Sequence, residues 1–144
     1  MPRIEMLTLA NHAEVQNGLM YLSGAEWDTL TRDIPHGADP PPQHLGIGVS
    51  VVVGWTETNQ RHLLRLWIED EDGQTGLLDV NAEIEVGRPP GMLHGTESRA
   101  PFAINGIIAF PNPGRYVVCA RVGSDVPLQY PFRIVDRPTQ DRSG

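Results

Sequence analysis

The chain contains no lysine and only one cysteine, Cys119. All 11 of its basic residues are arginines, a composition typical of chains encoded in GC-rich genomes. A single cysteine excludes an internal disulfide and is too few for a structural zinc site. The sequence therefore contains no sign of an oxidising compartment, and we expect its stability to come from a hydrophobic core.

Positive charge and long apolar runs are also scarce. The 18 acidic residues outnumber the 11 arginines, and the resulting net charge of −7 disfavours nucleic-acid backbones and anionic membranes as partners. Residues 1–12 have neither the apolar stretch nor the cleavage pattern of a signal peptide or membrane anchor. We therefore expect a cytoplasmic protein with no nucleic-acid partner and no membrane partner.

Short apolar runs separated by turn-forming residues fill most of the chain. Asn17-Gly18, Asp72-Gly73 and residues 111–114 are such turns, and no segment has sustained helical periodicity. This pattern predicts an all-β, single-domain antiparallel β-sandwich with Greek-key or jelly-roll-like connections. About eight strands are expected: 3–10, 19–27, 45–55, 62–69, 77–86, 102–110, 115–122 and 128–135.

One domain suits the length of the chain. A domain of 144 residues buries roughly 68–70% of the surface that its unfolded chain exposes, which is enough for a core. We place the β-sandwich domain at residues 1–136. The remaining residues, 137–144, are expected to form a flexible C-terminal tail.

The clearest strand signal is the closing hairpin, residues 115–122 and 128–135. Side chains alternate between the faces of a strand, so the large apolar residues of each strand share one face. These residues are Tyr116, Val118, Ala120, Val122, Leu128, Tyr130, Phe132 and Ile134. Pro131 cannot donate a ladder hydrogen bond, and it therefore predicts an edge position for the last strand and a candidate contact surface there.

Residues 45–55 predict a strand with two unlike faces. One face is bulky from Leu45 onwards, whereas the other contains Gly46, Gly48 and Ser50. We expect the small face to lie beneath bulky side chains of a neighbouring segment. Contact with the backbone of a partner is the alternative.

Strand 62–69 places Trp67 on the face opposite its core residues. Arg65 shares that face, and a guanidinium stacked on the indole ring would explain a tryptophan near solvent. A contact with a subunit or ligand at Trp67 is the alternative interpretation.

Two long loops, 31–44 and 87–99, are further candidates for binding. The first is rich in proline, and the second contains Arg88 and His94. Long loops on a rigid sandwich often carry binding sites, although Greek-key connections are also long. The candidate interaction surface thus consists of Arg65, Trp67, Arg88 and His94.

Asp79, Glu83 and Glu85 are the strongest catalytic candidates because they share one face of a predicted strand. Residues two apart on a strand lie about 6.5–7 Å apart, which is compatible with the carboxyl separation of about 5–5.5 Å in retaining glycosidases. Residues 82–87 nevertheless lack the Glu-aliphatic-Asp-aliphatic-aliphatic-Glu spacing of jelly-roll glycosidases. A solvated outer face is the favoured interpretation.

No spacing of residues indicates a metal site or a cofactor. The five histidines are not spaced as metal ligands, and the acidic run 69–73 lacks the EF-hand pattern and predicts a plain turn. Cys119 is expected to be a buried, inert thiol. We therefore predict no cofactor, no metal ligand and no catalytic residue.

Two segments resemble an uncharacterised bacterial, notably actinobacterial, β-sandwich family of unknown function. Residues 10–28 are similar to its Ala-Glu, Gly-Lys-Leu and Gly-x-x-Trp-Asp pattern, with Leu19 in place of the usual lysine. Residues 113–116, Pro-Gly-Arg-Tyr, and 131–135, Pro-Phe-Arg-Ile-Val, resemble its closing hairpin. The resemblance spans nearly the whole chain and implies the β-sandwich but no activity.

A non-enzymatic interaction module is the function that these observations favour. Such a module would bind a protein partner or form a homo-oligomer through a sheet face or edge. The alternative is a sandwich that binds a small molecule or carbohydrate, since exposed tryptophans can stack on sugars. Glycoside hydrolase activity through Asp79, Glu83 and Glu85 is a less favoured extension of this alternative.

Overall fold

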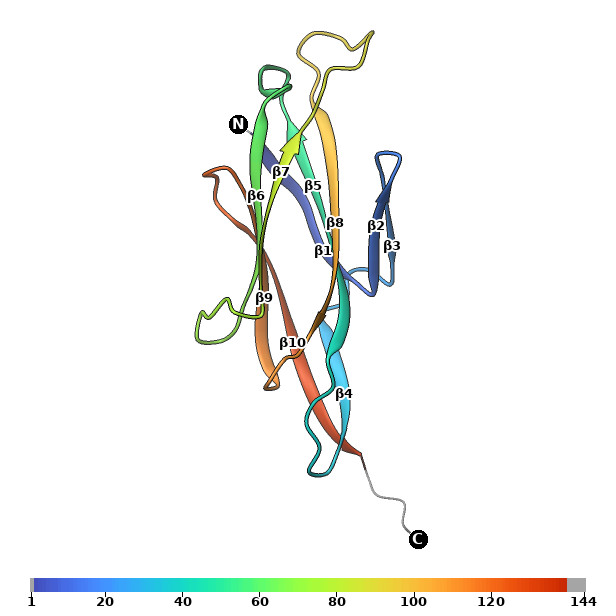
Figure 1. Cartoon of the computed structure of the whole chain (residues 1–144), viewed down its shortest axis with the longest axis vertical. Helices are drawn as coiled ribbons and strands as arrows, with labels where there is room; N and C mark the ends of the chain where they lie inside the picture. Colours follow the sequence, from blue (N-terminus) through green and yellow to red (C-terminus); the bar gives the residue numbers. More distant parts are fainter. Residues whose placement is uncertain (1, 140–144) are drawn as a thin grey trace.

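The computed structural model describes residues 2–139, which form ten strands and one short 3₁₀ helix (Figure 1). The helix, η1, is Trp55–Glu57. The strands are β1 (Arg3–Ala10), β2 (His12–Gln16), β3 (Leu19–Ser23), β4 (Thr29–Pro35), β5 (Gln43–Val53), β6 (Arg61–Glu69), β7 (Leu78–Glu85), β8 (Ser98–Ile108), β9 (Gly114–Val122) and β10 (Leu128–Thr139). Within residues 2–139 no helix has the length and hydrophobicity needed to cross a lipid bilayer.

Two sheets face each other across the core. One has the order β1-β5-β8 and the other β4-β10-β9-β6-β7. The chain crosses between them after β4, after β5, after β7 and after β8. The predicted all-β sandwich is confirmed, with two more strands than expected and one parallel pair, β4 with β10.

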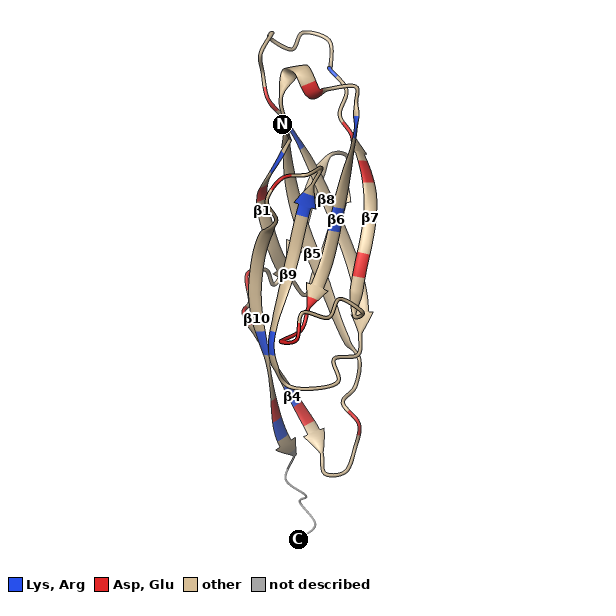
Figure 2. Cartoon of the chain, turned by 90° about the vertical axis from the view of Figure 1, so that its left-hand side faces the viewer, with Lys and Arg blue, Asp and Glu red and all other residues tan. Residues whose placement is uncertain are grey.

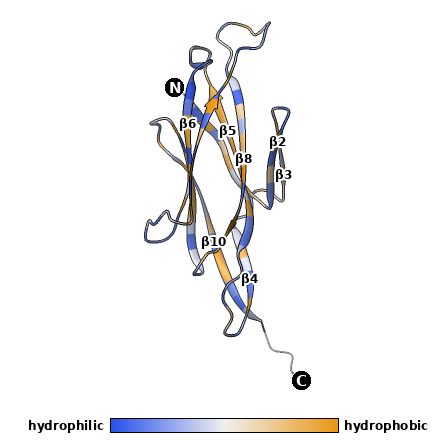
Figure 3. Ribbon diagram, in the orientation of Figure 1, coloured by the Kyte–Doolittle hydropathy of each residue, from blue (hydrophilic) through white to orange (hydrophobic). Residues whose placement is uncertain are grey.

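Alternating apolar residues on the inner faces of the two sheets form the core. On β5, the side chains of Leu45, Ile47, Val49, Val51 and Val53 are almost fully buried. The opposing sheet contributes residues of β6 and of the closing hairpin β9–β10. Figure 3 shows these hydrophobic stretches along β5 and β10. Period-two alternation thus sets which face of each strand is inside.

The closing hairpin forms as predicted, with β9 antiparallel to β10. At its start, the Tyr116 hydroxyl donates a 2.6 Å hydrogen bond to the Asn112 carbonyl. This contact has the form of a tyrosine corner, in which a tyrosine bonds the backbone just upstream. Burial raises the pKa of Tyr116. The Pro-Gly-Arg-Tyr segment therefore has a structural role, because it fixes the entry into β9.

The predicted edge position of the last strand is only partly correct. β4 pairs with β10 from Arg133 to Thr139, so only the first part of β10, residues 128–132, has a free edge, and Pro131 lies there. The strand also continues three residues beyond the predicted domain boundary at 136. Residues 140–144 of the predicted tail lie outside the described residues.

The predicted loop 31–44 is wrong in its first and last residues, since β4 ends at Pro35 and β5 begins at Gln43. β4 is anchored by Arg32, whose side chain is buried at 2% exposure. Its guanidinium donates to both Asp136 carboxylate oxygens, at 2.6 and 2.9 Å, and to the Phe110 carbonyl at 2.7 Å. Because this buried charge bonds to β10 and to the segment that follows β8, it fixes β4 in place.

The small face of β5 is covered by the β2–β3 hairpin, as the sequence predicted (Figure 1). A Cβ atom at Gly46 would lie 2.7 Å from the Ala13 amide nitrogen, and one at Gly48 would lie 2.9 Å from the Met20 sulfur. The Asn105 side chain accepts a hydrogen bond from the Ala13 N–H at 3.0 Å and donates one to the Ala13 carbonyl at 2.6 Å. Close approach of two backbones therefore requires glycine at position 46.

The hairpin turn is also as predicted. Asn17 and Gly18 have φ angles of 51° and 74°, the two positive values that a type I′ turn requires. The predicted strand 19–27 is too long, because β3 ends at Ser23.

Replacing Arg32 tests the role of the buried ion pair. We expect Arg32→Ala to lower the free energy of unfolding by about 3–5 kcal/mol, because the partly buried Asp136 carboxylate loses its partner. Arg137→Ala on the same strand pair is the control, since Arg137 and Asp33 are both well exposed, and it should cost less than about 1 kcal/mol. Urea denaturation measures both values, and equal losses would contradict the proposed anchoring.

Replacing Gly46 tests the close contact under the hairpin. Gly46→Ala should destabilise the protein by about 1–3 kcal/mol, because its methyl group collides with the Ala13 backbone. Gly76→Ala is the matched control: no atom lies within 4 Å of a Cβ there, so its effect should stay within about 0.5 kcal/mol. Thermal and urea unfolding monitored by circular dichroism would show the difference.

Candidate interaction groove

Arg65 and Trp67 lie on the outer face of the five-stranded sheet. The Arg65 guanidinium carbon is 4.2 Å from the centre of the Trp67 ring, and the indole Nε1 donates to Glu69 at 2.8 Å. Only 5% of Trp67 is exposed. The stacked arrangement is therefore confirmed, but the expected partial exposure of Trp67 is wrong, and the ring offers little free surface to a ligand.

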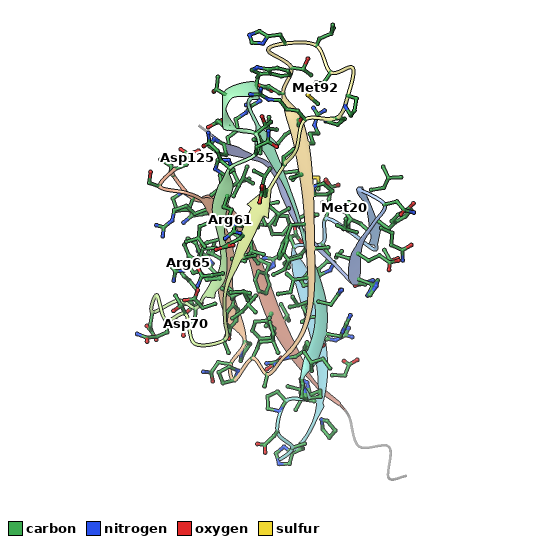
Figure 4. The ribbon with its side chains drawn as sticks, turned by 45° about the horizontal axis from the view of Figure 1, so that its top comes forward. Met20, Arg61, Arg65, Asp70, Met92 and Asp125 are labelled. Carbon is green, nitrogen blue, oxygen red and sulfur yellow. The ribbon has the colours of Figure 1, made fainter. Side chains whose placement is uncertain are left out.

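Arg88 and His94 gather elsewhere, around Trp55. The Arg88 guanidinium carbon lies 3.9 Å from the centre of the Trp55 ring, and His94 meets the ring edge-on at 4.8 Å between centroids. Arg88 donates to the Thr58 hydroxyl at 2.5 Å and to the Trp55 carbonyl. In Figure 4, Arg65 lies on β6, whereas Met92 marks the β7–β8 loop that carries His94 at the end of the sandwich. The four predicted residues thus form two separate clusters.

A concave feature of the surface is a groove between β7 and β8, which we call the lateral groove. Its volume is about 730 Å³. It opens on the side of the sandwich opposite to the one where β1 packs against β9 and β10. Its lining residues are Val15, Gly18, Glu83, Ile84, Glu85, Val86, Gly87, Arg88, Pro89, Arg99, Ala100, Pro101 and Phe102. Of the four predicted residues, only Arg88 belongs to it.

The floor of the lateral groove is apolar and belongs to the core. Ile84 is buried, while Val86, Ala100 and Phe102 are partly buried and pack against the core. Ile84 belongs to β7, Val86 follows β7 directly, and Ala100 and Phe102 belong to β8. β7 and β8 are terminal strands of the two sheets, and neither covers the side chains of the other. An open apolar floor between two sheet edges is a surface that a second chain can cover.

The two banks of the groove differ in charge. On the β8 bank, Arg99 donates two hydrogen bonds to Glu5, at 2.7 and 3.0 Å, which lower the pKa of the Glu5 carboxyl. On the β7 bank, Glu83 and Glu85 share Arg61 at 3.8 and 3.9 Å, and their side chains are 66% and 55% exposed. Figure 2 shows these acidic positions along β7. The β7 bank therefore keeps an excess of negative charge.

Two of the three candidate carboxylates, Glu83 and Glu85, line the lateral groove, whereas Asp79 does not. Asp79 is held by two hydrogen bonds from Arg65, at 2.9 and 2.7 Å, and these lower the pKa of its carboxyl. Glu83 and Glu85 border the lateral groove, whose lining within the described residues includes no tryptophan. The favoured interpretation, a solvated outer face of β7, agrees with this placement.

The acidic run forms the predicted turn. One Asp70 carboxylate oxygen accepts the backbone N–H groups of Asp72 and Gln74, each at 2.9 Å, and Glu71 accepts the Arg115 N–H at 2.9 Å. Across residues 2–139, no three His, Cys, Asp or Glu side chains gather closely enough to hold a metal ion.

Cys119 is buried, as the sequence predicted, but on the outer face of its sheet. It lies directly opposite Trp67 on the neighbouring strand. Burial raises the pKa of the thiol to about 11. Because the thiolate is the reactive form, Cys119 is a poor nucleophile at neutral pH.

Comparison with known families gives one match, described as a family of unknown function (DUF6941). The match covers residues 5–135, which is 131 of the 144 residues and includes the whole lateral groove. A search of curated proteins found no match.

The burial of Cys119 predicts slow modification. At pH 8 a thiol with a pKa of about 11 is about 0.1% ionised, so Ellman's reagent should modify the native protein at least 100-fold more slowly than the urea-unfolded chain. Trp67→Ala should accelerate the native reaction because it uncovers the opposite strand. Trp55→Ala, at the end of the sandwich, should not. Fast modification of the native wild-type protein would contradict this assignment.

Proposed function

The chain belongs to DUF6941, a family of unknown function, and we propose from its own surface that it is a non-catalytic module that binds a protein partner through the lateral groove. The observation that carries the proposal is the open apolar floor between β7 and β8. Exposed apolar surface bordered by charged residues is typical of protein-binding sites.

The arrangement of charged groups supports a binding role over a catalytic one. Each candidate carboxylate on β7 is paired with an arginine of β6, so none is set apart as an acid or a base. Proton transfer by paired carboxyl groups needs environments that separate their pKa values.

Composition supports a setting in the cytoplasm of a bacterium. Cys119 is the only cysteine, so the fold does not rely on disulfides, and arginine replaces lysine throughout. The net charge of −7 favours a protein partner over a nucleic acid or an anionic membrane.

Site-specific photo-crosslinking in the native host tests the role of the groove. With p-benzoylphenylalanine in place of Ala100, on the groove floor, we expect a covalent adduct with one defined protein. The same residue in place of Val135, an exposed position on β10, should not form that adduct.

The captured protein then serves for a direct affinity measurement. Ala100→Arg, which fills the groove, should weaken its binding at least tenfold in isothermal titration calorimetry, with folding checked by circular dichroism. Adducts of equal yield at both positions, or unchanged affinity of the folded variant, would show that the groove is not the binding site.

A further inference from the structure

We propose that β7 binds an extended segment of a partner protein by strand addition, and that this segment alternates basic and apolar residues. The inference rests on the proposed function, because it names the chemistry of the partner that the lateral groove accepts. It follows from the free edge of β7, from the two faces of that strand and from its charge.

β7 differs from the other free edges of the two main sheets within residues 2–139. β8 carries Pro101, β4 ends in Pro35, the free part of β10 carries Pro131, and β1 has a register shift between Ile4 and Met6. Prolines and bulges at edges oppose further strand pairing. The ladder of β7 with β6 runs without a shift from Leu78 to Glu85 and contains no proline. The outer edge of β7 is therefore an uninterrupted template.

The inward-facing side chains of β7 are apolar, so a strand added beside it should also place apolar residues on that face. Leu78, Val80, Ala82 and Ile84 point inward, and only Ile84 is fully buried. On its free side β7 has no neighbouring strand, and Ile84 lines the lateral groove together with Phe102. Apolar side chains at every second position of an added strand would fill this space.

The outer face of β7 is acidic, so an added strand should carry basic residues at the positions that alternate with its apolar ones. It presents Asp79, Asn81, Glu83 and Glu85, with no basic residue among them. Asp79 is neutralised by Arg65, whereas Glu83 and Glu85 share the single guanidinium of Arg61. Opposite charges directly across an antiparallel pair stabilise it, and like charges destabilise it.

The two arginines that line the groove do not neutralise this row of acidic residues. Arg99 is bound by Glu5, and Arg88 is bound by the Trp55 carbonyl and the Thr58 hydroxyl, beyond the end of β7. A strand alongside β7 therefore meets carboxylates along its outer face.

A second copy of this chain is a poor occupant of the edge. Antiparallel pairing of two β7 strands, with inner face matched to inner face, places the row Asp79, Asn81, Glu83, Glu85 against itself. Carboxylates would then lie opposite carboxylates or asparagine, with no basic residue between them. The charge pattern selects a different, basic chain.

The test uses an acetylated and amidated heptapeptide of alternating lysine and valine as the probe. We expect it to bind the full chain at least tenfold more tightly than the matched peptide of alternating glutamate and valine. The double variant Glu83→Lys/Glu85→Lys should weaken binding at least tenfold. Asp39→Lys/Asp125→Lys, on the β4–β5 and β9–β10 connections, changes the net charge equally and should change the Kd at most twofold (Figure 4 labels Asp125).

The backbone contribution is tested separately. N-methylation of alternate peptide residues removes backbone N–H groups that would donate hydrogen bonds to β7. When the methylated residues are those whose N–H groups face β7, binding should weaken at least tenfold. Binding of the unmodified peptide should also slow hydrogen exchange at those β7 amides that do not bond to β6.

The outcomes separate the two proposals. Equal weakening by both charge variants, or no protection of β7 amides, would leave only non-specific attraction and overturn strand addition. A partner captured at position 100 whose crosslinked segment is acidic or helical would also overturn strand addition, while the groove would stand as a binding site. Absence of any adduct at position 100 would overturn the binding role itself.

Discussion

The buried guanidinium of Arg32 is the interaction on which the closed side of the sandwich depends. It has almost no contact with water, so its charge must be satisfied by Asp136 and by the Phe110 carbonyl. Those partners belong to β10 and to the segment that follows β8, both of which are distant from Arg32 in sequence. By meeting both, Arg32 holds β4 parallel to β10 and closes this end of the five-stranded sheet.

Small residues allow the three-stranded sheet to be covered closely, whereas one side of the sandwich stays open. Gly46 and Gly48 let the β2–β3 hairpin approach the three-stranded sheet closely, and Asn105 fixes it there through the Ala13 backbone. β1 lies against β9 and β10 on one side of the sandwich. On the other side, no strand within residues 2–139 joins β7 to β8, so partly buried residues such as Phe102 form the floor of the lateral groove. The candidate site is thus the part of the core that the fold does not cover.

Sequence patterns predicted most strands and little of the site. The alternation in residues 115–122 identified the closing hairpin, and the small face beginning at Gly46 correctly indicated a covering segment. β4 was missed because its mixture of charged and apolar residues beside a proline-rich stretch does not alternate clearly. Arg88 was the only predicted surface residue in the groove, because loop length and charge carry no information on which strands end the two sheets.

The sequence by itself determined the local structure: the strands, the Asn17-Gly18 turn and the face of each strand that turns inward. It did so because alternation and turn chemistry act between near neighbours. Only the tertiary structure decided that Arg32 is buried against Asp136, and that β7 and β8 end their sheets on the same open side. These features depend on contacts between distant segments, whose pairing no local pattern encodes.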